Sequence, residues 1–196
     1  MGAFFVGKFQ ISLYDMAIMQ KLKLLLHTCC ACCGSVIAKQ LSETYDVTLF
    51  AFNSNIHPKA EYIRRLEDVL RVAKNLNLKV IEDDYDPQAW LHAVKGLENE
   101  PEGGKRCEIC FRLRLKQTAQ YAKEHGFDLF ASTLTTGRNK KANVINPIGS
   151  AIASTVGIPF LARDFKKQGG LDDSMAACAT HNIERQDYCG CVFSRK

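Results

Sequence analysis

The chain has 196 residues, 46% of them hydrophobic, and carries a formal net charge of +5. This length suits one α/β domain with a tail. The chain contains no run of about 18 uncharged apolar residues, which a membrane-spanning helix would need. Residues 1–20 lack the apolar run and cleavage site of a signal peptide. We expect them to be an N-terminal extension, or the product of a mis-assigned start, ahead of one domain over residues 21–196.

Short apolar runs alternate with amphipathic stretches along the chain. In chain order, the first predicted elements are a strand (22–27), a helix (34–43), a strand (47–52), a helix (61–75), a strand (79–81) and a helix (86–97). After a polar loop the predicted elements are a helix (107–125), a strand (129–132), a helix (143–156), a strand (158–161) and a helix (171–181). This alternation predicts a parallel sheet with helices on both faces, and a site at the carboxyl ends of its strands.

Nine cysteines fall into three clusters. They are Cys29, Cys30, Cys32 and Cys33; Cys107 and Cys110; and Cys178, Cys189 and Cys191. In a chain that we expect to be cytoplasmic, clustering favours metal binding or redox chemistry over structural disulfides. The first cluster follows the first strand and precedes a helix, whose N-terminus favours the thiolate that binds metals.

The spacing of the cysteines leaves several chemistries open. Cys107 and Cys110, at a helix start, could be half a zinc site, part of an iron–sulfur site or a redox dithiol. Adjacent Cys29 and Cys30 do not match a zinc ribbon, but two thiolates from each of two loops suffice for a cubane cluster. Cys189 and Cys191 could close a small, easily reduced disulfide or supply further metal ligands. Cys178, in a predicted helix, is interpreted as a packing residue.

Basic residues gather in three groups near the cysteines. They are Lys105, Arg106, Arg112, Arg114 and Lys116; Arg138, Lys140 and Lys141; and Lys166 and Lys167. Each group could simply be a solvated face. Beside cysteine clusters they favour a nucleic-acid partner, whose phosphates they would hold.

Taken together, these residues resemble the cobalamin-independent epoxyqueuosine reductases, the QueH family. The resemblance covers roughly residues 20–195 and rests on residues 27–33 (HTCCACC), 55–58 (NIHP) with Glu61 and Tyr62, 106–111 (RCEICF), 126–128 (GFD), 164–167 (DFKK) and 185–191 (RQDYCGC). It implies a Rossmann-like fold similar to the adenine nucleotide α-hydrolases (PP-loop-like), with a cysteine-bearing C-terminal tail. It also implies reduction of epoxyqueuosine to queuosine at the wobble position of tRNA, with an unidentified electron donor.

The resemblance also implies roles for particular cysteines. The implied ligands of a [4Fe–4S] cluster are Cys29, Cys30, Cys107 and Cys110, and the implied redox-active pair is Cys189 and Cys191. The family is reported to hold a further iron, for which Cys33 is a candidate ligand. Where the family usually has proline this chain has Cys32, a fifth thiol that could be an accidental or auxiliary ligand. Tyr188 and His27 are candidate proton donors, although each could equally be a packing residue.

Two other functions compete with this interpretation. An ATP-using thiolase or ligase of the same superfamily would need a Gly/Ser-rich phosphate loop after the first strand, where this chain has cysteines. A zinc-binding module that binds tRNA without catalysis would be colourless, whereas an iron–sulfur protein is brown.

Overall fold

The computed structural model describes residues 20–137, 139–167, 171–184, 186 and 188–195, without the side chains of Leu171 and Asp172. The predicted N-terminal extension therefore lies outside the described residues, apart from Gln20. Among the helices described, none combines the length and apolar character needed to cross a lipid bilayer.

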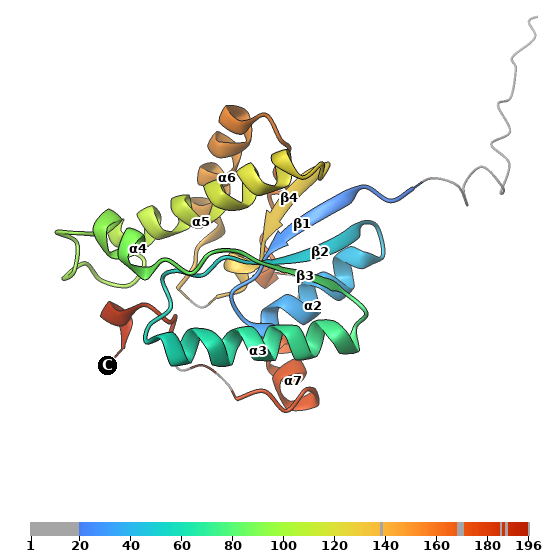
Figure 1. Cartoon of the computed structure of the whole chain (residues 1–196), viewed down its shortest axis with the longest axis horizontal. Coiled ribbons are helices and arrows are strands. Elements are labelled where there is room, and N and C mark those ends of the chain that lie inside the picture. Colours follow the sequence, from blue (N-terminus) through green and yellow to red (C-terminus); the bar gives the residue numbers. More distant parts are fainter. Residues whose placement is uncertain (1–19, 138, 168–170, 185, 187, 196) are drawn as a thin grey trace, which may run out of the picture.

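Four parallel strands form one sheet in the order β3-β2-β1-β4 (Figure 1). They are β1 (Lys23–His27), β2 (Asp46–Ala51), β3 (Lys79–Glu82) and β4 (Leu129–Ser132). The predicted fifth strand, 158–161, is reduced to a single bridge between Phe130 and Phe160. Because Pro159 has no N–H to donate, the ladder cannot extend through it. The predicted parallel α/β fold is otherwise confirmed.

Helices cover both faces of the sheet (Figure 1). One face carries α2 (Ala31–Ser42), α3 (Lys59–Asn75) and α7 (Leu171–Thr180), and the other carries α5 (Lys105–Glu124) and α6 (Ala142–Val156). Along β1, Leu24 and Leu26 pack into the first layer and Leu25 into the second, as the period of two in a strand requires. The short α4 (Pro87–Ala93) lies beside the start of α5.

Several element boundaries differ from the prediction. Helix α2 begins at Ala31, so Cys32 and Cys33 lie in its first turn rather than in the preceding loop. Helix α4 ends four residues before the predicted limit, and α6 forms with Pro147 inside it. A 3-10 helix, η1 (Thr133–Thr136), continues directly from β4, and the Ser132 hydroxyl accepts the Leu134 N–H at 3.2 Å.

The strand order places a natural site between β1 and β4. The chain winds from β1 outward through β2 to β3 and then returns to the other side of β1. The connections that leave the carboxyl ends of β1 and β4 diverge, which opens a crevice in folds of this kind. The first cysteine cluster follows β1, and η1 follows β4, so both border this crevice.

Candidate functional site

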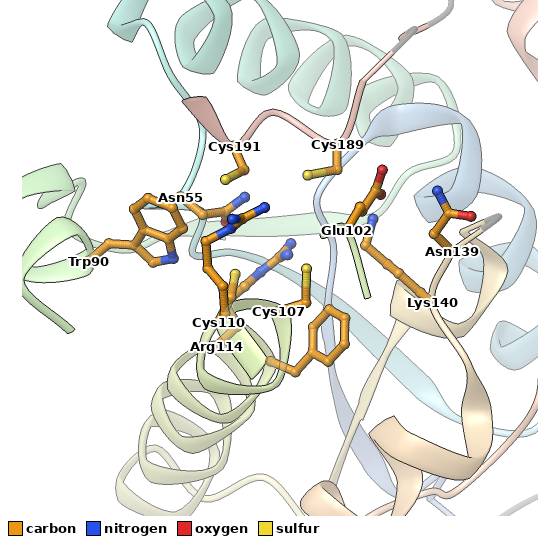
Figure 2. Close-up of a pocket in the computed structure, with 12 residues that line it drawn as sticks. Asn55, Trp90, Glu102, Cys107, Cys110, Arg114, Asn139, Lys140, Cys189 and Cys191 are labelled. Atoms are coloured by element: carbon orange, nitrogen blue, oxygen red, sulfur yellow. The ribbon is translucent and has the colours of Figure 1, made fainter. Parts of the chain in front are cut away.

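A cysteine-lined cavity lies at the carboxyl ends of the strands (Figure 2). It holds about 20 Å³ of free space, enough for one water molecule. Its walls come from the loop after β2, from α4, from the start of α5, from the segment before α6 and from the C-terminal tail. The lining residues are Asn55, Trp90, Glu102, Arg106, Cys107, Cys110, Phe111, Arg114, Asn139, Lys140, Cys189 and Cys191.

The first two turns of α5 present two thiols to this cavity. Cys107 and Cys110 are one turn apart, so both sulfurs face the same side of the helix. Burial raises the pKa of both thiols. Arg106 fixes the entry to the helix, because its Nη1 donates to the carbonyl oxygens of residues 97, 98 and 100 at 3.0, 2.8 and 2.6 Å. This explains why a charged side chain is only 2% exposed.

Arg114 is the central cation of the site. It is 3% exposed, and its Nη2 donates to the Asn53 side-chain oxygen at 2.7 Å. Its Nε donates to His27 Nε2 at 3.2 Å, and His27 Nδ1 lies 2.9 Å from the Ser132 hydroxyl. Arg114 also hydrogen-bonds to Cys29 and lies within the electrostatic range of Cys110 and Cys189. One guanidinium therefore interacts with thiols from three separate segments.

The C-terminal tail crosses back over the site and is held by α3. Arg65 donates through Nη1 and Nη2 to the carbonyl oxygens of Cys189 and Tyr188, both at 3.2 Å. Its Nε donates to Glu61 at 2.6 Å, which fixes the guanidinium. The His57 N–H donates to the Gly190 carbonyl at 2.8 Å, and the Tyr188 hydroxyl donates to the His57 carbonyl at 2.7 Å. These bonds anchor the chain from Tyr188 to Gly190.

Cys189 and Cys191 form an unequal pair of thiols within this tail. A hydrogen bond with Cys191 lowers the pKa of Cys189 to about 5, and the positive charge of Lys140 acts in the same direction. The same hydrogen bond raises the pKa of Cys191 above its usual range. The Ser194 hydroxyl lies 3.1 Å from the Cys189 sulfur. At neutral pH the pair therefore holds one thiolate and one thiol, which is the reactive form of a dithiol.

The first cysteine cluster lies on the other side of Arg114. A hydrogen bond to Cys30, reinforced by burial, raises the pKa of Cys29 to about 12. A hydrogen bond with Cys30 lowers the pKa of Cys33 to about 7, with help from Thr136 and Ser174. Cys29 lines a second, small cavity together with Arg65 rather than the cavity of Figure 2. Within this cluster, therefore, the proton is held least tightly by Cys33.

Cys32 and Cys178 are joined by a disulfide. Cys178 is buried as predicted, but the interpretation of this residue as packing alone was wrong. Cys32 points from the first turn of α2 into the layer beneath α7, away from its neighbours at the site, so the disulfide removes it from the free thiols. The expectation that clustered cysteines avoid structural bridges therefore fails at this position.

The structure brings the predicted site residues together in two groups rather than one. Cys107 and Cys110 face Cys189 and Cys191 across the cavity (Figure 2), whereas Cys29, Cys30 and Cys33 contact one another. Among the described side chains, no three histidine, cysteine or acidic residues are gathered closely enough to hold one ion. The donor set nevertheless suits an iron–sulfur cluster, since thiolates are its usual ligands.

The predicted proton donors are engaged elsewhere. Burial, together with the charge of Arg114, holds the pKa of His27 well below its usual range, so its imidazole is neutral and orients Arg114. The Tyr188 hydroxyl is committed to the His57 carbonyl. Lys140 instead lines the cavity, and against the effect of burial the charges of Cys29 and Cys189 raise its pKa. Its protonated ammonium group therefore lies at the wall of the cavity that holds the thiols.

Comparison with known proteins identifies the family. Residues 24–196 match the family model described as Epoxyqueuosine reductase QueH. The chain is 42% identical over 179 residues to the Epoxyqueuosine reductase QueH of Streptococcus pyogenes serotype M1, covering 88% of this chain and 70% of that protein. It is 40% identical over 180 residues to the protein of the same name from Staphylococcus epidermidis, covering 88% and 76% of the two chains.

A relative of lower sequence identity and a solved structure also match this chain. The Epoxyqueuosine reductase QueH of Thermotoga maritima is 35% identical over 173 residues, covering 87% of this chain and 88% of that protein. A predicted subunit of tRNA methyltransferase from Methanocaldococcus jannaschii has a similar fold, with a TM-score of 0.58 at 13% identity over 79% of this chain and 74% of that one. At that identity the likeness shows the fold alone.

Proposed function

We propose that this chain, which belongs to the epoxyqueuosine reductase QueH family, reduces epoxyqueuosine to queuosine at the wobble position of tRNA. The observation that carries the proposal is the cavity in which two pairs of thiols face each other between Arg114 and Lys140. Neither an ATP-using enzyme nor a passive binding module needs such an arrangement. The reaction belongs in the cytoplasm, where tRNA is found.

The stoichiometry of the reaction matches a dithiol. Removing an epoxide oxygen as water, to leave an alkene, consumes two electrons and two protons. Oxidation of the Cys189 thiolate and the Cys191 thiol to a disulfide releases two electrons and one proton. The second proton would come from the Lys140 ammonium at the cavity wall, so the balance closes on these three side chains. Before the next turnover an external electron donor must reduce the disulfide and solvent must return a proton to Lys140.

The other cysteines would hold the inorganic cofactor. We assign Cys29, Cys30, Cys107 and Cys110 to a [4Fe–4S] cluster and Cys33 to a further iron. When bound, the cluster and iron would supply single electrons and a Lewis acid for the epoxide oxygen. Because the metal-free thiols of Cys29, Cys107 and Cys110 have raised pKa values, binding must displace their protons.

The remaining side chains of the cavity would stabilise negative charge that forms during the reaction. Arg114 and Lys140 place two cations beside the thiolates, so negative charge that forms on a leaving oxygen would be stabilised. The Lys140 ammonium carries a proton at the cavity wall, where it could be delivered to that oxygen. The tail and Trp90 close the cavity, so only about one water fits inside it. The substrate base must therefore displace part of the tail when it enters.

Conversion of the nucleoside tests this function directly. Protein purified without oxygen is incubated with epoxyqueuosine-containing tRNA and a chemical reductant, and queuosine is measured after digestion by mass spectrometry. We expect turnover by the wild type, loss of iron, sulfide and turnover in Cys110→Ala, and loss of turnover with retained iron in Cys191→Ser. A colourless zinc protein that never converts the nucleoside would identify a binding module instead. Turnover that requires ATP would indicate a ligase or thiolase.

A further inference from the structure

A second and much larger hollow lies beside the cysteine cavity. It has about 580 Å³ of free space and opens to solvent. Its lining residues are Lys141, Ala142, Asn143, Asn146, Pro147, Asp164, Lys166 and Lys167. We call it the lysine hollow, because three lysines and one aspartate are its charged groups. Among the described residues, no acidic side chain forms an ion pair with Lys141 or Lys167.

Two elements build the walls of the lysine hollow. One wall is the first turn of α6, whose N-cap residue, Lys141, makes no side-chain capping bond. The other wall is the segment 164–167, which is anchored by Phe165, only 1% exposed. The Thr135 hydroxyl fixes this segment, since it donates to the Arg163 carbonyl at 3.1 Å and accepts the Phe165 N–H at 3.2 Å. Lys166 and Lys167, which directly follow Phe165, are therefore held beside the hollow by the core.

Consecutive residues of one segment line the lysine hollow and the cysteine cavity. Asn139 and Lys140 line the cysteine cavity, and Lys141, the next residue, lines the lysine hollow. Figure 2 shows the Lys140 side chain extending from this segment toward the cysteines. Successive groups of one ligand could therefore occupy both spaces, with an uncharged, ring-shaped group in the cysteine cavity and an anionic group in the hollow.

We propose that the lysine hollow binds a backbone phosphate of the substrate RNA, next to the nucleotide whose base enters the cysteine cavity. This inference rests on the proposed function, because it takes the RNA to be the substrate. A phosphodiester group is a fixed negative charge, and lysines that neutralise such charges release counterions from the nucleic acid. The uncapped N–H groups at the start of α6 add to the same positive potential. The Asp164 carboxylate would oppose the anion, so the phosphate should lie toward the lysines.

An RNA-binding measurement on the full chain tests the proposal without any turnover. The probe is a fluorescent anticodon stem–loop RNA, and its dissociation constant is measured by anisotropy between about 50 and about 200 mM salt. The test variant is Lys141→Ala with Lys167→Ala. The matched control is Lys23→Ala with Lys79→Ala, which removes the same charge from exposed positions at the amino ends of β1 and β3. Thermal melts establish that both variants fold.

The expected result is specific to the hollow. The test variant should bind at least tenfold more weakly at low salt, and its plot of log K against log salt should be shallower by about one to two units. The control should keep the wild-type slope within about half a unit. Asp164→Asn should bind more tightly, because it removes the opposing charge from the same hollow. Equal loss in the test and control variants would overturn the proposal, since it would mean diffuse attraction by net charge.

The rival occupant is an acidic electron-donor protein, and the same variants separate the two. The contrary outcome is a test variant that binds RNA like the wild type, turns over normally with a chemical reductant and turns over slowly with a protein donor. That result would mean that the hollow binds the electron-donor protein, and the RNA proposal would be wrong. Failure of the proposed function is distinguishable, because RNA could bind through these lysines even if no epoxyqueuosine were converted. Inorganic phosphate alone serves as a competitor, and it should release the RNA only at high concentration.

Discussion

Arg65 Nη1 donates a hydrogen bond to the carbonyl oxygen of Cys189 at 3.2 Å, although 124 residues separate the two in sequence. Arg65 is only 3% exposed, and its ion pair with Glu61 holds the guanidinium in place. A side chain on α3 thus sets the position of a thiol that the last segment of the chain supplies. Its effect on the reaction is indirect, because it touches the backbone of the pair rather than either sulfur.

Replacing Arg65 should release the redox pair. Arg65→Ala removes two charge-assisted bonds to the tail, each worth about 1.5–3 kcal/mol. We expect alkylation of Cys189 to accelerate by about two orders of magnitude, measured by mass spectrometry of the modified peptide. Arg65→Lys should give a smaller effect, because one ammonium cannot grip both carbonyls. Arg64→Ala, which removes the neighbouring partner of Glu61, is the control and should leave the alkylation rate unchanged.

Gly190 should not tolerate a side chain. Its φ is +99°, and an added Cβ would lie 2.9 Å from Ile56 Cγ1 and 3.0 Å from Arg65 Nη1. Gly190→Ala should therefore combine about 1–2 kcal/mol of backbone strain with displacement of the tail. Gly96→Ala is the control, since Gly96 has φ +84° but no atom within 4 Å of its added Cβ. Thermal unfolding should show a loss in both variants, with rapid alkylation of Cys189 only in Gly190→Ala.

The low pKa of Cys189 predicts a characteristic pH profile in metal-free protein. Because the folded pKa of about 5 lies well below the ordinary pKa of a cysteine thiol, the thiolate persists through neutral pH and is lost only as the pH falls through about 5. The alkylation rate of Cys189 should therefore be flat from pH 9 to about pH 6 and fall below it. Cys191→Ser weakens the hydrogen bond that causes the shift, so the fall should move to higher pH. A wild-type profile with its midpoint near 8 or 9 would contradict this assignment.

The disulfide between Cys32 and Cys178 should make stability depend on the redox state. It joins residues 146 apart in sequence, and a crosslink of that span stabilises a fold by up to about 5 kcal/mol. Reduction should lower the melting temperature of the wild type and leave that of Cys178→Ser unchanged. Both proteins should melt at similar temperatures once reduced. If reductant lowered both equally, the stabilisation would come from another pair of cysteines.

The fold was largely predictable from the sequence because hydrophobic periodicity is a local signal. The run over β1 and the amphipathic pattern of α3 each indicate one element without knowledge of its neighbours. The fifth strand was overestimated because the apolar run 158–161 satisfies the pattern, while Pro159 blocks the ladder. The first turn of α2 was missed because cysteines have no strong helix preference.

The site was only partly predictable, because its connections are long-range. Motifs identified the cysteines of α5 and of the tail, but no local pattern indicates that they face each other. Arg65 was not singled out in the sequence, because its i, i+4 spacing from Glu61 is typical of ordinary exposed helix faces. Lys140 belonged to a recognised basic group, but its place beside the thiols depends on where η1 ends. The partner of Cys178 likewise depends on how α7 docks on α2.

The C-terminal tail has a consequence for how the protein matures. With the tail in place, the thiol-lined cavity has room for about one water, so no inorganic cluster could pass into it. The tail is held in place by hydrogen bonds from Arg65 and His57. The form that could be loaded is therefore one whose tail is undocked, and the docked tail would then retain the cluster. Loading and closure would then be separate events, and closure depends on the hydrogen bonds that Arg65 and His57 make with the tail.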